Sequence, residues 1–184
     1  RTLARIENYE YLIPENKNFF ANLGVDYLIL PEKLAAMEIV ESIKYTWLRQ
    51  NLSFHNEALI LLAVKLRENA LILNKKFNTG FFDHGKFRVV AINRNGTTII
   101  PSGGDEIMAN DVVYFVTMKE NLEFVREQSG KKDYQVRNVM IMGGSRIAQK
   151  TIQYLPNNIN VKILERDKNK CYQLAGCLNN ALII

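Results

Sequence analysis

A glycine-rich turn near residue 143 is the stretch of this chain whose residue types and spacing suit a chemical task. Gly143, Ser145 and Ala148 fall on positions one, three and six of the dinucleotide pattern G-x-G-x-x-G/A. An apolar stretch, Val139 to Met142, precedes the turn, and an amphipathic stretch follows it. A turn of this kind directs backbone N–H groups and the positive end of a helix toward a phosphate. The pattern therefore predicts a phosphate-binding loop.

Charged residues extend this candidate site beyond the turn. Glu165 closes the next predicted strand, 22 residues after Gly143, where an acidic side chain can accept hydrogen bonds from ribose hydroxyls. Arg146 would place a cation beside the phosphates. The predicted nucleotide-binding residues are Gly143, Gly144, Ser145, Arg146, Ile147, Ala148, Glu165 and Arg166.

The turn departs from the dinucleotide pattern at its second glycine, which Ser145 replaces. A side chain there places a Cβ where the pyrophosphate normally approaches the backbone, although a serine hydroxyl can donate to a phosphate instead. The alternative interpretation is a tight turn that binds nothing, with Glu165 a solvated strand end and Arg146 a surface charge. The pattern alone leaves both interpretations open.

The segments on either side of the middle of the chain alternate strands with helices, which predicts parallel sheets. Residues 1–51 are expected to hold strands at 2–6 and 26–30, a helix at 15–23 and a second helix after Pro31. Ala36, Val40, Ile43 and Trp47 form the apolar stripe of that second helix. Residues 131–184 are expected to hold strands at 139–142, 161–164 and 181–184 and helices at 145–155 and 168–177.

Residues 52–130 follow a different pattern, that of a small α+β module. Asn95-Gly96 is a strong tight-hairpin signal between two predicted strands. Expected elements are strands at 58–66, 87–93, 97–100 and 112–117, a helix at about 119–128 and a polar linker from Gln128 to Asp133. The fold class is therefore α/β, with two partial Rossmann-like segments flanking this module.

Composition restricts the possible functions. The longest apolar run, Ala58 to Val64, is far shorter than the roughly 20 residues that cross a bilayer. Two cysteines without a nearby histidine cluster predict neither a disulfide scaffold nor a metal site, and they fit a cytosolic protein. His55 and His84, the only histidines, lie in a segment with no convergent acid–base set, so no catalytic residues are expected.

The excess of positive charge lies toward the end of the chain. Residues 131–184 carry 9 basic and 3 acidic groups within an overall net charge of +5, which favours contact with phosphates. No aromatic ladder or recognition helix accompanies the basic residues, so a nucleotide is favoured over nucleic acid. The chain opens on Arg1 inside a strand-like stretch and closes on a buried-strand pattern, so we expect an internal fragment of a longer protein.

The order of these elements resembles Trk-type potassium-uptake regulators of the regulator-of-potassium-conductance (RCK) family. Residues 2–6, 23–26 and 29–39 resemble the last two strands and the crossover helix of the family's nucleotide-binding (RCK N-type) domain. Residues 99–112 resemble its C-terminal (TrkA-C-like, RCK C-type) module. Residues 139–148 with 161–167 resemble the start of a second nucleotide-binding domain. The resemblance covers essentially the whole chain.

The resemblance implies a function that the residues alone do not. Family proteins form cytoplasmic rings, built as dimers that assemble into a tetramer, at the inner face of the membrane. There they regulate a TrkH-like potassium translocator in response to NAD(H) or ATP/ADP. By position, the turn corresponds to the family's phosphate loop and Glu165 to its ribose-binding acid. The alternative function is an NAD(P)-dependent oxidoreductase, which the turn alone suggests; nucleic-acid binding is a weaker third.

Overall fold

The structure, a computed structural model, describes residues 1–54, 58–82, 84–132 and 134–184, so the predictions at His55 and Asp133 lie outside the described residues. The chain divides into two compact units. Residues 1–44 and 136–184 form one of them, here called the α/β unit. Residues 45–135 form the other, here called the sheet unit. The sheet unit thus begins at Tyr45, earlier than the boundary predicted at residue 52.

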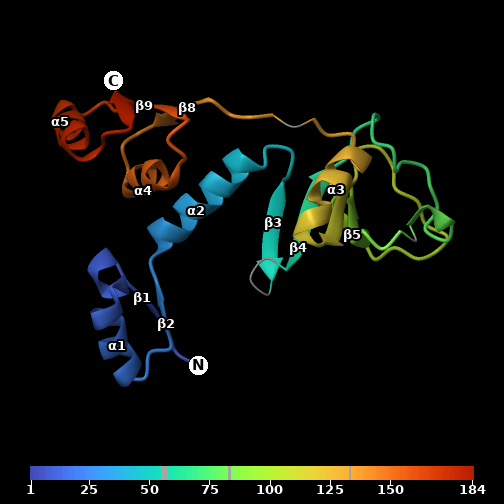
Figure 1. Ribbon diagram of the computed structural model, residues 1–184, viewed down its shortest axis with the longest axis horizontal. Coiled ribbons are helices and arrows are strands. Elements are labelled where there is room, and N and C mark those ends of the chain that lie inside the picture. The colour runs from blue at the N-terminus through green and yellow to red at the C-terminus, as the bar shows by residue number, and fades with distance from the viewer. Residues whose placement is uncertain (55–57, 83, 133) are drawn as a thin grey trace. The chain divides into compact units, whose positions relative to one another are not determined.

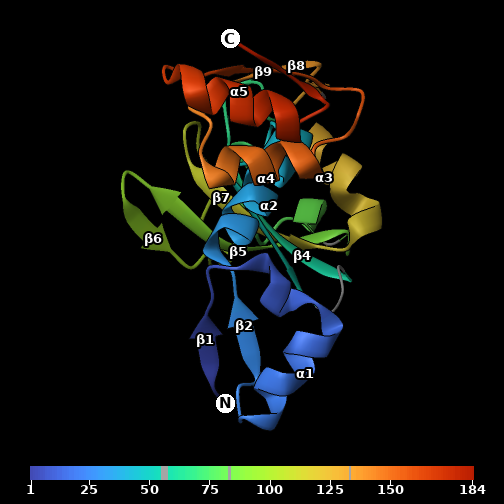
Figure 2. The ribbon, with the colours of Figure 1, turned by 90° about the vertical axis from the view of Figure 1, so that its left-hand side faces the viewer.

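The start of the α/β unit is a two-stranded parallel sheet with a helix beside it (Figure 2). Strand β1 (Leu3–Arg5) pairs with β2 (Tyr27–Ile29), and the short helix η1 (Tyr9–Leu12) and α1 (Pro14–Asn22) connect them. Gly24 follows α1 with φ +83°, a conformation that favours glycine and ends the helix. The predicted parallel strands and connecting helix are therefore present.

Helix α2 (Pro31–Lys44) begins at a proline, a favourable first helical residue. Its Val40 and Ile43 pack against the apolar cluster formed by the C-terminal part of the α/β unit. The prediction that Trp47 continues the apolar stripe of this helix is wrong. The helix ends at Lys44, and Trp47 instead packs against the core of the sheet unit.

The rest of the α/β unit has the expected strand–helix alternation. Its three strands are parallel in the order β10-β9-β8, so each helix connects neighbouring strands. The core is formed by α4, α5 and the central strand β9, with Ile163 fully buried. The bounds are β8 Asn138–Met142, α4 Arg146–Tyr154, β9 Asn160–Leu164, α5 Lys168–Cys177 and β10 Ala181–Ile183. Figure 1 shows α4 beside β8 and β9.

The sheet unit contains a five-stranded antiparallel sheet in the order β3-β4-β7-β5-β6. Strand β3 was not predicted, because Gln50, Asn51 and Ser53 give it little apolar character and it lies at the sheet edge. The bounds are β3 Gln50–Phe54, β4 Leu59–Lys65, β5 Phe87–Arg94, β6 Thr97–Ile99 and β7 Val112–Thr117, with helices η2 Gly80–Phe82, η3 Lys119–Asn121 and α3 Leu122–Gln128.

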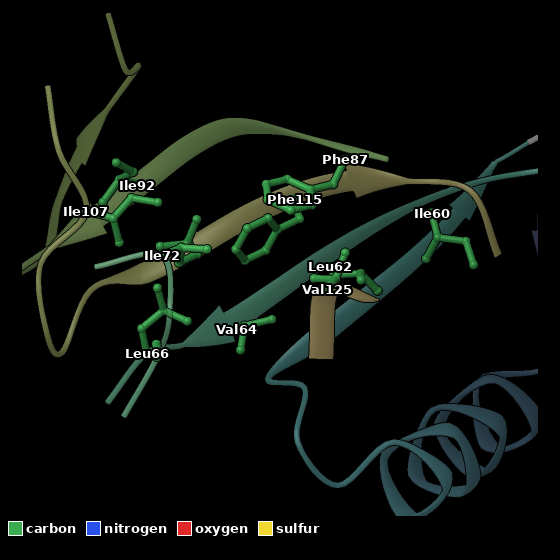
Figure 3. Packing of buried hydrophobic residues seen from close by; sticks show 12 residues of the cluster. Ile60, Leu62, Val64, Leu66, Ile72, Phe87, Ile92, Ile107, Phe115 and Val125 are labelled. Carbon is green, nitrogen blue, oxygen red and sulfur yellow. The ribbon is translucent and has the colours of Figure 1, made fainter. Parts of the chain in front are cut away.

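The predicted Asn95-Gly96 hairpin joins β5 to β6. Both residues have positive φ, +52° and +86°, as a two-residue hairpin turn with this sequence requires. One face of the sheet carries the core of the unit. Leu62 and Phe115, from β4 and β7, lie with Val125 of α3 among these side chains (Figure 3).

Two polar arrangements complete the sheet unit. Asp111 is 2% exposed and accepts two hydrogen bonds from the Arg94 guanidinium, at 2.9 and 2.8 Å. Gly130, expected in a linker, instead ends α3 with φ +65°. Its N–H donates to the carbonyl of Glu127, and its own carbonyl accepts from the Asn69 amide. The polar composition around Gly130 therefore reflects a helix cap rather than a free connection.

Candidate functional site

The glycine turn begins where β8 ends, at Gly143. Its N–H donates to the carbonyl of Leu164 at 2.8 Å, which continues the pairing of β8 with β9 by one residue. Its φ of +91° is a conformation that residues with a side chain rarely adopt, and open space surrounds the position of a Cβ. Gly143 therefore provides the turn, as the first glycine of the pattern does.

Gly144 is needed for packing. A Cβ at this position would lie 2.2 Å from Leu174 Cδ1, and Leu174 is only 2% exposed in the core of the α/β unit. The Gly144 N–H donates to Glu165 Oε2 at 2.9 Å. The absence of a side chain thus lets α5 pack closely against the turn and lets the carboxylate reach the loop.

Ser145 is the N-cap of α4. Its backbone is extended, with φ −64° and ψ 167°, and its Oγ accepts a hydrogen bond from the Ala148 N–H at 3.1 Å. The residue that replaces the second glycine is therefore unstrained and caps the helix. An accepting hydroxyl keeps its own proton, so Ser145 remains able to donate to a phosphate.

Backbone donors remain available at this helix end. In the described part of the chain, the N–H groups of Ser145, Arg146 and Ile147 have no hydrogen-bond partner. The carbonyl of Ile147 accepts from Thr151 Oγ1, and Ala148 is 5% exposed and belongs to the packed face of the helix. Unpaired N–H groups at the start of a helix form a site for an anion.

Glu165 follows β9 and lies beside the turn. Besides the Gly144 N–H, its carboxylate accepts hydrogen bonds from the N–H groups of Arg166, at 2.9 Å, and Asp167, at 3.2 Å. Lys170 Nζ lies 2.8 Å from Oε2. The Arg166 residue is exposed and contributes its backbone N–H to this arrangement. The structure thus brings the predicted acid and the predicted loop together.

The surroundings of Glu165 keep it ionised. The hydrogen bond from Lys170, followed by those from the N–H groups of Gly144 and Asp167, lowers the pKa of its carboxyl from 4.5 to about 2. An ionised carboxylate at the end of β9 has the chemistry that recognises hydroxyl groups, and a ribose would share oxygens that already accept from Gly144, Arg166, Asp167 and Lys170. Sequence reasoning missed Lys170, although a lysine in the first turn of a helix is unfavourable to the helix dipole and was a usable signal.

The depressed pKa of Glu165 gives a test of this arrangement. Because the folded pKa lies below the unfolded one, ionisation stabilises the folded unit above pH 4.5, and the contribution disappears as the pH falls through about 2. An NMR titration of the Glu165 carboxyl carbon should therefore give a midpoint near 2. In Lys170→Met the midpoint should rise. A wild-type midpoint near 4.5 would contradict the contacts around Glu165.

Arg146 is paired with a residue from a distant part of the sequence. Its NH2 group lies 3.1 Å from Glu32 Oε1, in the first turn of α2. The Arg146 side chain is 66% exposed, whereas that of Glu32 is 15% exposed. Glu32 was not predicted as part of the site, because nothing local in the sequence links α2 to the loop.

The described residues include no group of three or more His, Cys, Asp or Glu side chains suited to a metal ion. Within the same ranges, no helix has the length and apolar character needed to span a membrane.

Comparisons with known proteins agree with this architecture. Residues 61–130 match the profile of the TrkA-C domain. The chain is 30% identical over 98% of its length to the Trk system potassium uptake protein TrkA of Haemophilus influenzae, and equally so to that of Vibrio alginolyticus. It spans 40% of the length of each of these relatives. A solved structure of the GsuK channel has a similar fold, with a TM-score of 0.53 at 9% identity over 90% of this chain and 29% of that chain.

The α/β architecture, with a small module between Rossmann-like segments, is that of an RCK-type protein, so the predicted fold class is confirmed. More particularly, residues 61–130 match the TrkA-C domain and the chain is similar to TrkA proteins over 98% of its length, which confirms the resemblance found in the sequence. The segment boundaries at 1–51, 52–130 and 131–184 and the assignment of nucleotide-binding residues remain predictions.

Proposed function

We propose that this chain is the nucleotide-sensing part of a cytoplasmic regulatory subunit of a potassium uptake system. In this proposal the loop at residues 143–148 binds NAD(H) or an adenine nucleotide. The bound nucleotide changes how the subunit acts on a membrane potassium translocator. The relatives are named as potassium uptake proteins, and these names support the assignment to a potassium uptake system. The geometry of the loop supports the ligand class.

The observation that carries the proposal is the set of three unpaired N–H groups beside a fixed carboxylate. The N–H groups of Ser145, Arg146 and Ile147 are suited to phosphate oxygens, and the Arg146 guanidinium lies on the same helix turn. Glu165, held by Gly144 and Lys170, is suited to the ribose hydroxyls. The turn therefore offers groups suited to a phosphate, and Glu165 beside it is a group suited to a ribose.

A regulatory role is favoured over an oxidoreductase. Hydride transfer to a carbonyl needs a proton donor near the nicotinamide, and histidine is the usual choice. The α/β unit that holds the loop contains no histidine in its sequence. In this proposal the partners are a TrkH-like translocator and further copies of the chain, assembled from dimers into a ring. That partnership would place the protein at the inner face of the cell membrane.

The nucleotide site is tested by titration of NADH and of ATP into the intact protein by calorimetry. Arg146→Ala removes a charge-assisted contact and Glu165→Ala removes the ribose acceptor, so each should weaken binding by about tenfold. Lys162→Ala removes a cation from an exposed position on β9 and should leave the affinity unchanged. If the first two variants bind both nucleotides as the wild type does, the turn is a structural one and the proposal fails.

A further inference from the structure

We propose that Glu32 of α2 competes with the nucleotide for Arg146, so that ligand binding at the loop releases the start of α2. This inference rests on the proposed function and assigns a regulatory step to the same site. It gives α2 a direct chemical connection to the ligand, through one arginine that is able to pair with a carboxylate or with a phosphate.

The two ends of the ion pair differ in their surroundings. Glu32 is largely buried, and its Oε2 atom is enclosed without a hydrogen-bond partner among the described residues. Among the ion pairs of the described residues, only the one with Arg146 involves Glu32, and the Arg146 NH2 group lies 3.1 Å from Oε1. Arg146, by contrast, is mostly exposed and has freedom to turn away. A buried carboxylate is costly when its counter-ion leaves, so Glu32 depends on Arg146 more than Arg146 depends on Glu32.

Packing fixes Glu32 in front of the loop helix. Farther along α2, Val40 and Ile43 lie against the cluster that includes Ile152 of α4. Because α2 is anchored there, its first turn is held near Arg146, the first residue of α4. The two helices therefore meet through an apolar contact at one place and an ion pair at another, and only the ion pair involves a residue of the proposed site.

A phosphate at the loop changes this balance. A guanidinium binds phosphate oxygens in a bidentate manner, and the N–H groups beside it hold the phosphate in position. When Arg146 turns to the ligand, Glu32 is left with a buried, unpaired charge. Moving the first turn of α2 toward water then lowers the free energy, because the carboxylate becomes hydrated. Nucleotide binding and the closed position of α2 therefore oppose each other, and this coupling is reciprocal. Since α2 ends at Lys44, directly before the sheet unit, the released helix is the covalent route to that unit.

The competition is tested with Glu32→Gln in the intact protein, titrated with ATP and with NADH. Removing the competing charge frees Arg146, so affinity should rise about fivefold. Glu38→Gln removes the same charge from an exposed position on the same helix and should change nothing. In an Arg146→Ala background, Glu32→Gln should have no effect, because the pair no longer exists. Glu32→Asp shortens the side chain and should also raise nucleotide affinity. This second variant keeps the test valid if Glu32→Gln fails to fold.

Hydrogen exchange provides a second measurement. Nucleotide should speed exchange of the α2 amides in the wild type and change it little in Glu32→Gln, where the pair is already absent. Equal affinities for wild type and Glu32→Gln overturn the competition alone, provided that Gly143→Val, which distorts the turn, abolishes binding. If Gly143→Val binds as tightly as the wild type, the loop is not the nucleotide site and the proposed function fails together with this inference.

Discussion

Replacement of Asp111 by alanine is expected to destabilise the sheet unit by about 3–5 kcal/mol. Asp111 is 2% exposed and satisfies two donors of Arg94 and the N–H of Met108. Its removal leaves a partly buried guanidinium without its carboxylate, and the cost of an unpaired charge exceeds the net value of the pair. Urea unfolding followed by the fluorescence of Trp47, the only tryptophan, measures this unit because Trp47 packs against its core.

Glu68→Ala is the control for Asp111. Glu68 is exposed in the same unit, so its removal should leave the free energy of unfolding nearly unchanged. Replacing both partners, Arg94 by methionine and Asp111 by leucine, should recover much of the lost stability, because no buried charge is then left unpaired. A loss below about 1 kcal/mol for Asp111→Ala would show that the pair is not structurally important.

Gly130→Ala should destabilise the same unit by about 2–4 kcal/mol, for two separate reasons. The residue has φ +65°, which a side chain disfavours, and a Cβ would lie 2.5 Å from the backbone oxygen of Asn69. That oxygen belongs to the main chain and cannot move aside as the end of a flexible side chain does. The same Trp47 fluorescence measurement applies, because α3 packs on the core of this unit through Val125.

Two other glycines separate these causes. Gly96 has φ +86° but open space around a Cβ, so Gly96→Ala should show the conformational cost alone, about 1–2 kcal/mol. Gly104 has neither a positive φ nor a neighbour within 4 Å, so Gly104→Ala should have no effect. If Gly130→Ala costs no more than Gly96→Ala, the close approach of Asn69 contributes nothing to the stability of the α3 terminus.

Local signals in the sequence were sufficient for most of the architecture. Alternating strand and helix patterns predicted the parallel strands of the α/β unit, because a helix between two strands is long enough to return the chain to the same edge of the sheet. The Asn95-Gly96 pair predicted the hairpin, since few residues other than glycine and asparagine accept positive φ. The G-x-S-x-x-A pattern predicted the turn between β8 and α4 for the same reason.

Predictions of secondary structure failed where tertiary contacts outweighed the local sequence pattern. Trp47 continued the spacing of the α2 stripe, yet it packs against the core of the other unit, because the helix ends at Lys44. Strand β3 has few apolar residues and exists because β4 provides hydrogen bonds along its whole length. Gly130 lay in a polar stretch typical of a linker, and its positive φ and its hydrogen bond to the carbonyl of Glu127 reveal a helix cap.

The sequence by itself determined the glycine turn between a strand and a helix, the position of Glu165 after the next strand, and the resemblance to potassium-uptake regulators. These properties depend on residues close together in the chain, where spacing alone specifies geometry. Only the tertiary structure decided that Arg146 pairs with Glu32, more than a hundred residues earlier. Contacts between distant segments depend on how the elements pack, and the residue pattern within one element does not specify which other element it contacts.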